Sequence, residues 1–192
     1  MRLFVAVYPP PGAVAHLGAR VARLRTGAAA AAGIDVRLAD PADAHVTLAF
    51  LGDVEADRLV AVESALGLAA ESFRAGRAAA PLLRLAGGGR FGRGRCTVLW
   101  VDLRGEVEPL LALAGLIRSR LRHARLPYDE KPFRAHLTIA RPGDRMSPPD
   151  VAADVAALDD YEGPRWPAAE LVLVRSRTGP RRSHDRLAAW PL

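Results

Sequence analysis

A short pattern that occurs twice constrains the fold of this chain more than any other feature. His45-Val46-Thr47 and His136-Leu137-Thr138 both read His-x-Thr, and they stand 91 positions apart. In an extended strand, neighbouring side chains point to opposite faces, so the histidine and the threonine of each copy share one face. Their bases lie roughly 6–7 Å apart, close enough to converge on one tetrahedral anion. The pattern therefore predicts two β-strands that together grip a phosphate.

The segments around the two motifs follow the same order of expected elements. Apolar spacing and turn residues predict strands at 2–8, 44–51, 81–85, 97–103, 135–140 and 171–174, a final strand or tail at 187–192, and helices at 13–32, 54–75, 106–123 and 151–158. Each motif strand follows a strand and a long helix. This order indicates an internal duplication.

We expect an α+β fold with two pseudo-symmetric lobes of antiparallel sheet, helices outside, and one His-x-Thr strand per lobe lining a central cleft. No Gly/Ser-rich or charged linker separates the halves, so residues 1–192 are expected to form a single bilobal domain. Residues 1–8 read as a strand that runs into prolines, unlike a signal peptide, and no apolar run approaches the roughly 20 residues of a membrane span. A cytoplasmic monomer without a membrane partner is expected.

The charge of the chain points to an anionic partner without identifying it. The formal net charge is +6 at pH 7, which suits nucleic acid. Apart from Lys131, however, every Lys/Arg position is arginine and alanine is abundant, a composition that a codon-biased genome also produces. The single cysteine, Cys96, excludes an intramolecular disulfide and a cysteine-based zinc site.

Two histidines on either side of a phosphodiester can divide proton transfer between them. An unperturbed imidazole has a pKa of about 6.5, so one ring can act as a neutral base while the other acts as a protonated acid. The hydroxyls of Thr47 and Thr138 can donate to phosphoryl oxygens, and Arg141 adds a cation. A metal centre is the competing reading, but the nearby carboxylates show no recognisable ligand spacing. We therefore expect no metal and no cofactor.

The motifs also carry a family resemblance. In the fuller forms His45–Gly52 and Pro132–Arg141, with residues 1–7, 99–101, 173–176 and 190–192, the chain resembles the 2H phosphoesterase superfamily, and within it the RNA 2′,3′-cyclic phosphodiesterases long called 2′-5′ RNA ligases. The resemblance implies a bilobal α+β fold and metal-independent hydrolysis of RNA 2′,3′-cyclic phosphate ends, or of cyclic nucleotides, to 2′-phosphomonoesters. It implies that His45 is the proton donor and His136 the proton acceptor, with Thr47, Thr138 and Arg141 binding the phosphate.

Two other functions remain open at this stage. The protein could recognise phosphorylated RNA ends without turning them over, or it could join ends in the reverse direction of the hydrolysis. The two near-symmetric histidines could also exchange roles with the direction of the reaction.

Four further features carry expectations. Alternation along the first motif strand places Phe50 on the core side, and His184 is expected in a solvated, Arg-rich loop, with an approach to RNA as the alternative. Residues 87–95 read as a flexible hairpin connection whose arginines could steer RNA. Finally, relatives commonly carry a tyrosine after the Gly-Pro of the last loop, whereas this chain has Gly179-Pro180-Arg181-Arg182.

Overall fold

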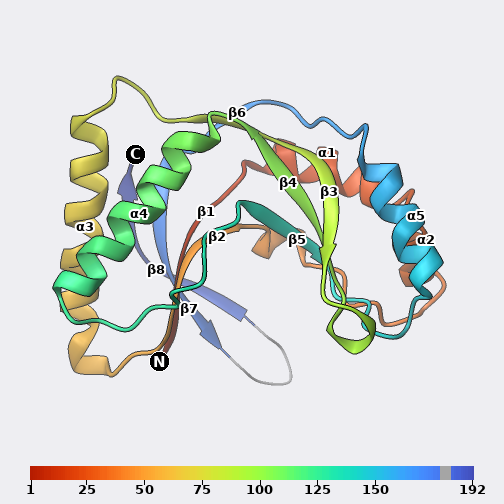
Figure 1. Ribbon diagram of the computed structural model, residues 1–192, viewed down its shortest axis with the longest axis horizontal. Helices are drawn as coiled ribbons and strands as arrows, with labels where there is room; N and C mark the ends of the chain where they lie inside the picture. Colours follow the sequence, from red (N-terminus) through yellow and green to blue (C-terminus); the bar gives the residue numbers. More distant parts are fainter. Residues whose placement is uncertain (178–182) are drawn as a thin grey trace.

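Two four-stranded antiparallel sheets form the centre of the molecule (Figure 1). The computed structural model describes residues 1–177 and 183–192. The first sheet has the order β2 (Val46–Asp53), β1 (Arg2–Val7), β7 (Glu170–Arg177) and β8 (Ser183–Pro191), and the second has the order β5 (His136–Ala140), β4 (Val98–Gly105), β3 (Leu82–Phe91) and β6 (Trp166–Pro167). Each motif strand lies at one edge of its sheet. The α+β class, the two antiparallel sheets and the outer helices are confirmed.

The two lobes are not the two halves of the sequence. β1 is buried along almost its whole length, so it needs a partner on each edge. β2 supplies one partner, and β7, from the C-terminal part of the chain, supplies the other. The first sheet is therefore completed only by the last strands of the chain, and the repeated element order does not map onto two contiguous units.

Two of the helices pack on a different sheet from the strand that precedes them in the chain. α3 (Leu59–Ala75) and α4 (Val107–His123) pack together, on β8 and β2 respectively, while α5 (Pro148–Leu158) and α1 (Pro11–Val21) pack on β3 of the second sheet, where α2 (Arg25–Ala31) contacts α5. Figure 1 shows these two helix groups on opposite sides of the molecule. α1 follows β1 yet covers the second sheet, and α4 follows β4 yet covers the first. None of the helices in the described ranges is long and apolar enough to cross a membrane.

The helix expected at 13–32 is interrupted, and the cause lies far along the chain. Leu24 is extended and only 2% exposed. After it, the backbone N–H groups of Arg25 and Thr26 donate to the Asp154 carboxylate at 2.7 and 2.9 Å, so a side chain of α5 caps the start of α2. The expected single helix is therefore two helices, α1 and α2.

The glycine run that was expected to be a flexible connection lies inside β3. A Cβ on Gly88 would come within 2.6 Å of Leu158, and one on Gly89 within 2.4 Å of the Trp100 indole. The register of β3 on β4 shifts between Ala86 and Gly89, which marks a bulge. The glycines therefore admit close packing, and the turn itself follows at η3 (Gly94–Cys96).

Backbone hydrogen bonds hold each motif strand to a connection that belongs to the other sheet. The N–H of Asp129, just before β5, donates to the carbonyl of Phe50 in β2 at 2.8 Å. In return, Ala39 N–H donates to Ile139 O at 2.9 Å and Arg141 N–H donates to Arg37 O at 3.1 Å. β2 and β5 are in contact as a result. The two shorter helical turns η1 (Pro41–Asp43) and η2 (Ala56–Arg58) flank β2.

Candidate active site

The structure places both motifs at the beginning of their strands with the predicted alternation. His45 directly precedes β2, and His136 is the first residue of β5. In the first copy Val46 and Leu48 are buried while the histidine and the threonine are partly exposed, and the second copy has the same burial pattern. The apolar residues pack into the core and hold the polar residues of each motif on the opposite face.

Both histidines are oriented by the same backbone contact. Nδ1 of His45 lies 2.6 Å from the carbonyl oxygen of Asp43, and Nδ1 of His136 lies 2.7 Å from the carbonyl oxygen of Arg134. A carbonyl oxygen can only accept, so the proton of each neutral ring resides on Nδ1. Each Nε2 is then the atom available to take up or release a proton.

His45 lies among aromatic rings of the first sheet. Phe4 of β1 stacks on it at 4.8 Å between ring centroids, and Tyr8 lies at 5.8 Å. His184 of β8 meets it edge-on at 5.2 Å and meets Phe4 at 5.1 Å. The expectation that His184 belongs to a solvated loop is therefore wrong, because the pairing of β8 with β7 carries this residue onto the sheet beside the first motif.

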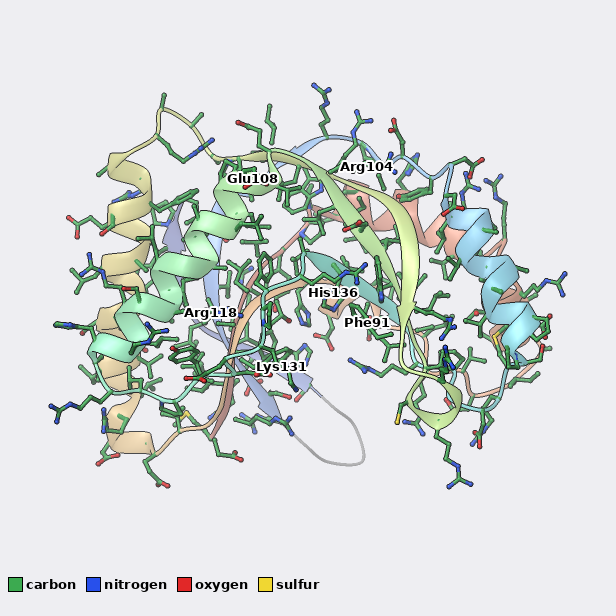
Figure 2. The ribbon with its side chains drawn as sticks, viewed as in Figure 1. Phe91, Arg104, Glu108, Arg118, Lys131 and His136 are labelled. Carbon is green, nitrogen blue, oxygen red and sulfur yellow. The ribbon has the colours of Figure 1, made fainter. Side chains whose placement is uncertain are left out.

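His136 has a different set of neighbours from the second sheet. The Phe91 ring meets it edge-on at 4.9 Å, and Trp100 lies 6.2 Å away. The guanidinium of Arg134 lies 4.5 Å above the Trp100 ring and 5.2 Å above Phe91, which are cation–π distances. Figure 2 shows Phe91 and His136 near the middle of the molecule.

Burial lowers the pKa of both histidines, but the charges around them differ. At His45, desolvation is the largest cause, and the Asp43 carboxylate opposes it whereas His184 and His136 add to it. At His136, desolvation again dominates, with Arg134 and Arg141 lowering the pKa further and Asp102 raising it. His136 contributes to the lowering of the His45 pKa, and β2 contacts β5, so the two imidazoles lie near each other across the two sheets.

The three residues predicted to bind phosphate accompany these histidines. Thr47 and Thr138 follow their histidines by two positions and are partly exposed like them. Within residues 1–177 and 183–192, neither threonine side chain makes a hydrogen bond to protein. Arg141 directly follows β5, is exposed, and is close enough to His136 to lower its pKa. The arrangement offers two hydroxyl donors and a cation next to two proton-transfer groups.

Phe50 does not lie on the core side. Its side chain is 50% exposed, and its ring is 6.1 Å from that of Phe4. The register of β2 on β1 shifts between the pairs Ala49–Val5 and Thr47–Ala6, which leaves Leu48 as an extra residue. This bulge reverses the alternation and brings Phe50 onto the face that carries His45.

The other basic segments have partners of their own. Arg175 and Arg177 both donate to Oδ2 of Asp185, at 2.7 and 2.5 Å. Arg95 of the β3–β4 hairpin pairs with Asp144 at 3.2 Å. The segment Gly179-Pro180-Arg181-Arg182, where the family tyrosine is missing, lies outside the described residues.

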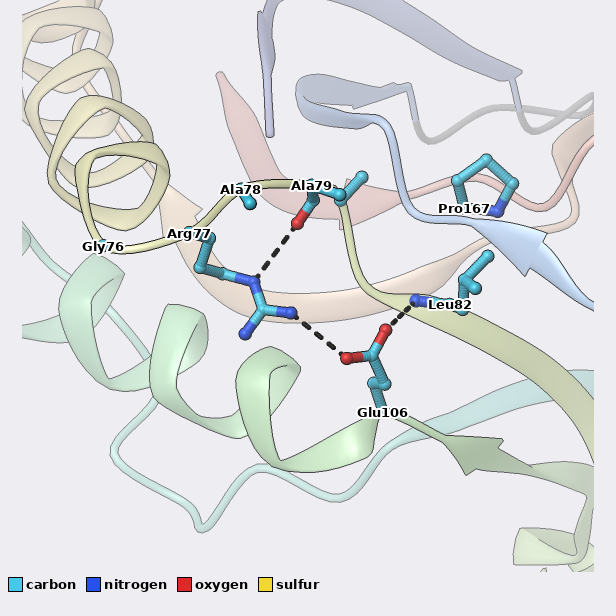
Figure 3. A pocket seen from close by; sticks show the side chains of 8 residues that line it. Gly76, Arg77, Ala78, Ala79, Leu82, Glu106 and Pro167 are labelled. Atoms are coloured by element: carbon cyan, nitrogen blue, oxygen red, sulfur yellow. Dashed lines mark hydrogen bonds and ion pairs between the residues drawn. The ribbon is translucent and has the colours of Figure 1, made fainter.

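A surface hollow of about 560 Å³ lies elsewhere, between residues 76–82, Glu106 and Pro167 (Figure 3). Its polar groups satisfy one another: Arg77 donates to the Glu106 carboxylate at 3.3 Å, and that carboxylate accepts from Leu82 N–H at 2.7 Å. We assign this hollow a structural role at the start of α4.

No cluster of three or more His, Cys, Asp or Glu side chains suited to a metal ion occurs in the described part of the chain. The central cleft remains a prediction.

Comparisons with known proteins show which family this chain belongs to. The family model of the 2′-5′ RNA ligase superfamily matches residues 9–180. An RNA 2′,3′-cyclic phosphodiesterase of Thermus thermophilus is 30% identical over 191 residues, which cover 94% of this chain and 84% of that protein. A Geobacillus stearothermophilus protein of the same name is 30% identical over 155 residues, covering 78% of this chain but 46% of its own length.

The solved structures agree at the level of the fold. A crystal structure of a protein of Thermus thermophilus matches with a TM-score of 0.70 and 28% identity, covering 100% of this chain and 98% of that one. The chain aligns with only about half the length of some of the curated relatives. The match to the family model and the extent of the Thermus alignment show that this chain belongs to the 2′-5′ RNA ligase superfamily.

Proposed function

We propose that this protein hydrolyses the 2′,3′-cyclic phosphate ends of RNA to 2′-phosphomonoesters with two histidines and no metal ion. The names of its relatives support the reaction. The observation that carries the mechanism is the matched pair of imidazoles, each with Nδ1 held by the carbonyl two residues before it. This arrangement leaves two Nε2 atoms in one site for proton transfer. A monomer acting in the cytoplasm belongs to the same proposal.

In the proposed reaction, water attacks phosphorus and the bond from phosphorus to the ribose 3′ oxygen breaks. Nε2 of His136 takes a proton from the attacking water, and Nε2–H of His45 gives a proton to the departing 3′ oxygen. The products are a 2′-phosphomonoester and a 3′ hydroxyl. The enzyme ends with His45 neutral and His136 protonated, and exchange with solvent restores the starting forms.

The charges around the two rings support this division of roles. Arg134 and Arg141 disfavour a proton on His136 while Asp102 favours one, and the two arginines help to keep this ring in the neutral form that can accept a proton. The Asp43 carboxylate favours a proton on His45, so it helps to keep this ring in the protonated form that can act as the acid. The bound phosphodiester is itself an anion and raises the pKa of both rings, which offsets the lowering by burial.

The phosphate is held by the remaining motif residues in this proposal. The hydroxyls of Thr47 and Thr138 donate to the two non-bridging oxygens, one from each sheet, and Arg141 balances their charge. Negative charge grows on these oxygens as water adds, so the donors stabilise the transition state more than the substrate.

The test is an oligoribonucleotide with a 2′,3′-cyclic phosphate end, incubated with the protein, with the product ends mapped. We expect a 2′-phosphate as product, no effect of a chelator, and a loss of roughly 10²–10⁴ in turnover for His45→Ala and for His136→Ala. His123→Ala, on the exposed last turn of α4, is the matched control and should retain full activity.

Other products would point to the alternatives. Tight binding of unchanged substrate would indicate an RNA-binding protein, and joined ends at high RNA concentration would indicate ligation. Loss of activity with chelator, or full activity in either motif variant, would contradict the proposed mechanism.

A further inference from the structure

His184 occupies a position that the proposed reaction does not use. Its side chain is 21% exposed, and its Nδ1 lies 3.5 Å from Oδ1 of Asp43. This nitrogen is buried and makes no hydrogen bond with any residue in the described ranges. A buried polar atom without a hydrogen bond is unfavourable, so its presence beside a carboxylate calls for an explanation.

Asp43 connects this histidine to the first motif. Its backbone carbonyl accepts from Nδ1 of His45 at 2.6 Å, while its carboxylate faces Nδ1 of His184. The two imidazoles also meet edge-on at 5.2 Å, and Phe4 contacts both rings. The His45 ring is thus enclosed by Phe4, by His184 and by Asp43, which contacts both histidines.

We propose that His184 is a positioning residue for His45: it fixes the orientation of that ring and, through the shared Asp43, couples its own proton to the one that His45 transfers. A proton on Nδ1 of His184 would complete an ion pair with the Asp43 carboxylate. The same proton would place a positive charge beside His45 and favour release of its proton to the departing oxygen. The catalytic meaning of this inference rests on the proposed function, whereas the coupling between the two histidines does not.

The groups that face His45 can be named from every element around it. His184 and His136 lower its pKa, and the Asp43 carboxylate raises it. Tyr8 lies at 5.8 Å from the His45 ring and has the Arg186 guanidinium 5.3 Å from its own ring. Asp185, the neighbour of His184, is paired with Arg175 and Arg177. Asp43 is therefore the carboxylate that can mediate between the two imidazoles.

The test combines His184→Phe and Asp43→Asn in a double-mutant cycle. Phenylalanine preserves a ring against Phe4 and His45 but removes the charge, and asparagine removes the carboxylate but preserves the backbone carbonyl. His123→Phe is the matched control. The primary measurement is an NMR titration of the His45 ring signals in the free protein, which needs no substrate. Thermal unfolding verifies that each variant is folded, and His184→Gln replaces the phenylalanine variant if that variant does not fold.

We expect His184→Phe to raise the pKa of His45 by roughly half a pH unit to one pH unit, because a like charge about 5 Å away is removed. Asp43→Asn should lower the pKa of His45, and by more in the His184→Phe background than alone, because in that background no second proton compensates. In the pH profile of kcat/KM, His184→Phe should move only the alkaline limb, to higher pH. His123→Phe should move neither.

An unchanged pKa of His45 in a folded His184→Phe variant, or additive effects in the cycle, would overturn the coupling and leave His184 a packing residue. If the wild-type protein does not hydrolyse a cyclic phosphate but the titrations behave as expected, the proposed function fails while the coupling stands. If hydrolysis proceeds and the titration of His45 is unaffected, the coupling fails alone.

Discussion

The surroundings of His45 and His136 differ although the two motifs present their rings in the same way. Both rings are fixed through Nδ1 by a carbonyl two residues earlier. At His45 the nearest groups are aromatic rings, the Asp43 carboxylate and a third histidine, while at His136 they are aromatic rings, two arginines and the Asp102 carboxylate. The motif therefore determines which nitrogen is presented, whereas the charged neighbours that act on the pKa differ between the two rings.

The largest effect should come from a substrate whose leaving group needs no proton, because it distinguishes the role of the general acid from that of the general base. On an activated phosphodiester whose nitrophenolate leaves without protonation, we expect His45→Ala to lose at most about tenfold in turnover, against roughly 10²–10⁴ on a cyclic phosphate. His136→Ala should lose roughly 10²–10⁴ on both substrates, because water still needs a base. The reverse pattern would exchange the two roles.

A smaller effect is expected from the threonines, and it tests whether the two sheets contribute equally. Thr47→Val and Thr138→Val keep the shape of the side chain but remove a hydroxyl donor. Each should lower kcat by about 10–100-fold with little change in KM, because the donor acts most strongly on charge that develops in the transition state. Thr→Ser at each position is the matched control. A loss of kcat in only one of the two valine variants would show that the threonine of a single sheet binds the phosphate.

Phe50 is a strongly exposed aromatic residue on the His45 side, and its substitution tests whether that side contacts a base. Its exposed ring offers a stacking surface for a base, so Phe50→Ala should raise KM for an oligonucleotide by about 3–10-fold and leave kcat nearly unchanged. The same variant should handle a small cyclic nucleotide almost normally if Phe50 contacts a neighbouring base. Leu111→Ala, an exposed apolar position on α4, controls for loss of apolar surface. An unchanged KM for the oligonucleotide would contradict stacking on Phe50.

The smallest effect concerns the arginines beside His136. Arg134 lowers the pKa of His136, so Arg134→Gln should raise that pKa by a few tenths of a unit and move the acid limb of kcat/KM to higher pH. The alkaline limb, which reports His45, should stay in place. Because burial lowers the pKa of both histidines, the wild-type profile in kcat/KM should be centred below the ordinary histidine value of about 6.5. A shift of the alkaline limb instead would show that Arg134 acts on the first motif.

The sequence was sufficient wherever structure depends on neighbouring residues. Val46, Leu48, Leu137 and Ile139 are buried as alternation predicts, because the period of a strand is local. The prediction for Phe50 was wrong because the bulge at Leu48 arises from pairing with β1, which the sequence of β2 does not reveal. The break between α1 and α2 depends on Asp154, which lies 129 residues from Arg25.

His184 illustrates the same limit at the site itself. Its neighbours along the chain are arginines, a serine and an aspartate, which favour a surface loop, and only the pairing of β8 with β7, and of β7 with β1, carries it to His45. The apolar residues at 187–192 indicated a final strand or tail, but they did not indicate which strand would be the partner. Pairing between strands that are far apart in the sequence cannot be predicted from the residues of either strand alone.

The placement of β7 and β8 beside β1 has a consequence for protein synthesis. A ribosome releases the first motif when only β1 can pair with β2, so His45 waits for its remaining neighbours until residues 170–191 have emerged. The second sheet, built from residues 82–167, can form before that moment. In a nascent chain the sheet that carries His136 can thus be complete before the sheet that carries His45, and the contact between His45 and His184 forms only after the last strands have joined.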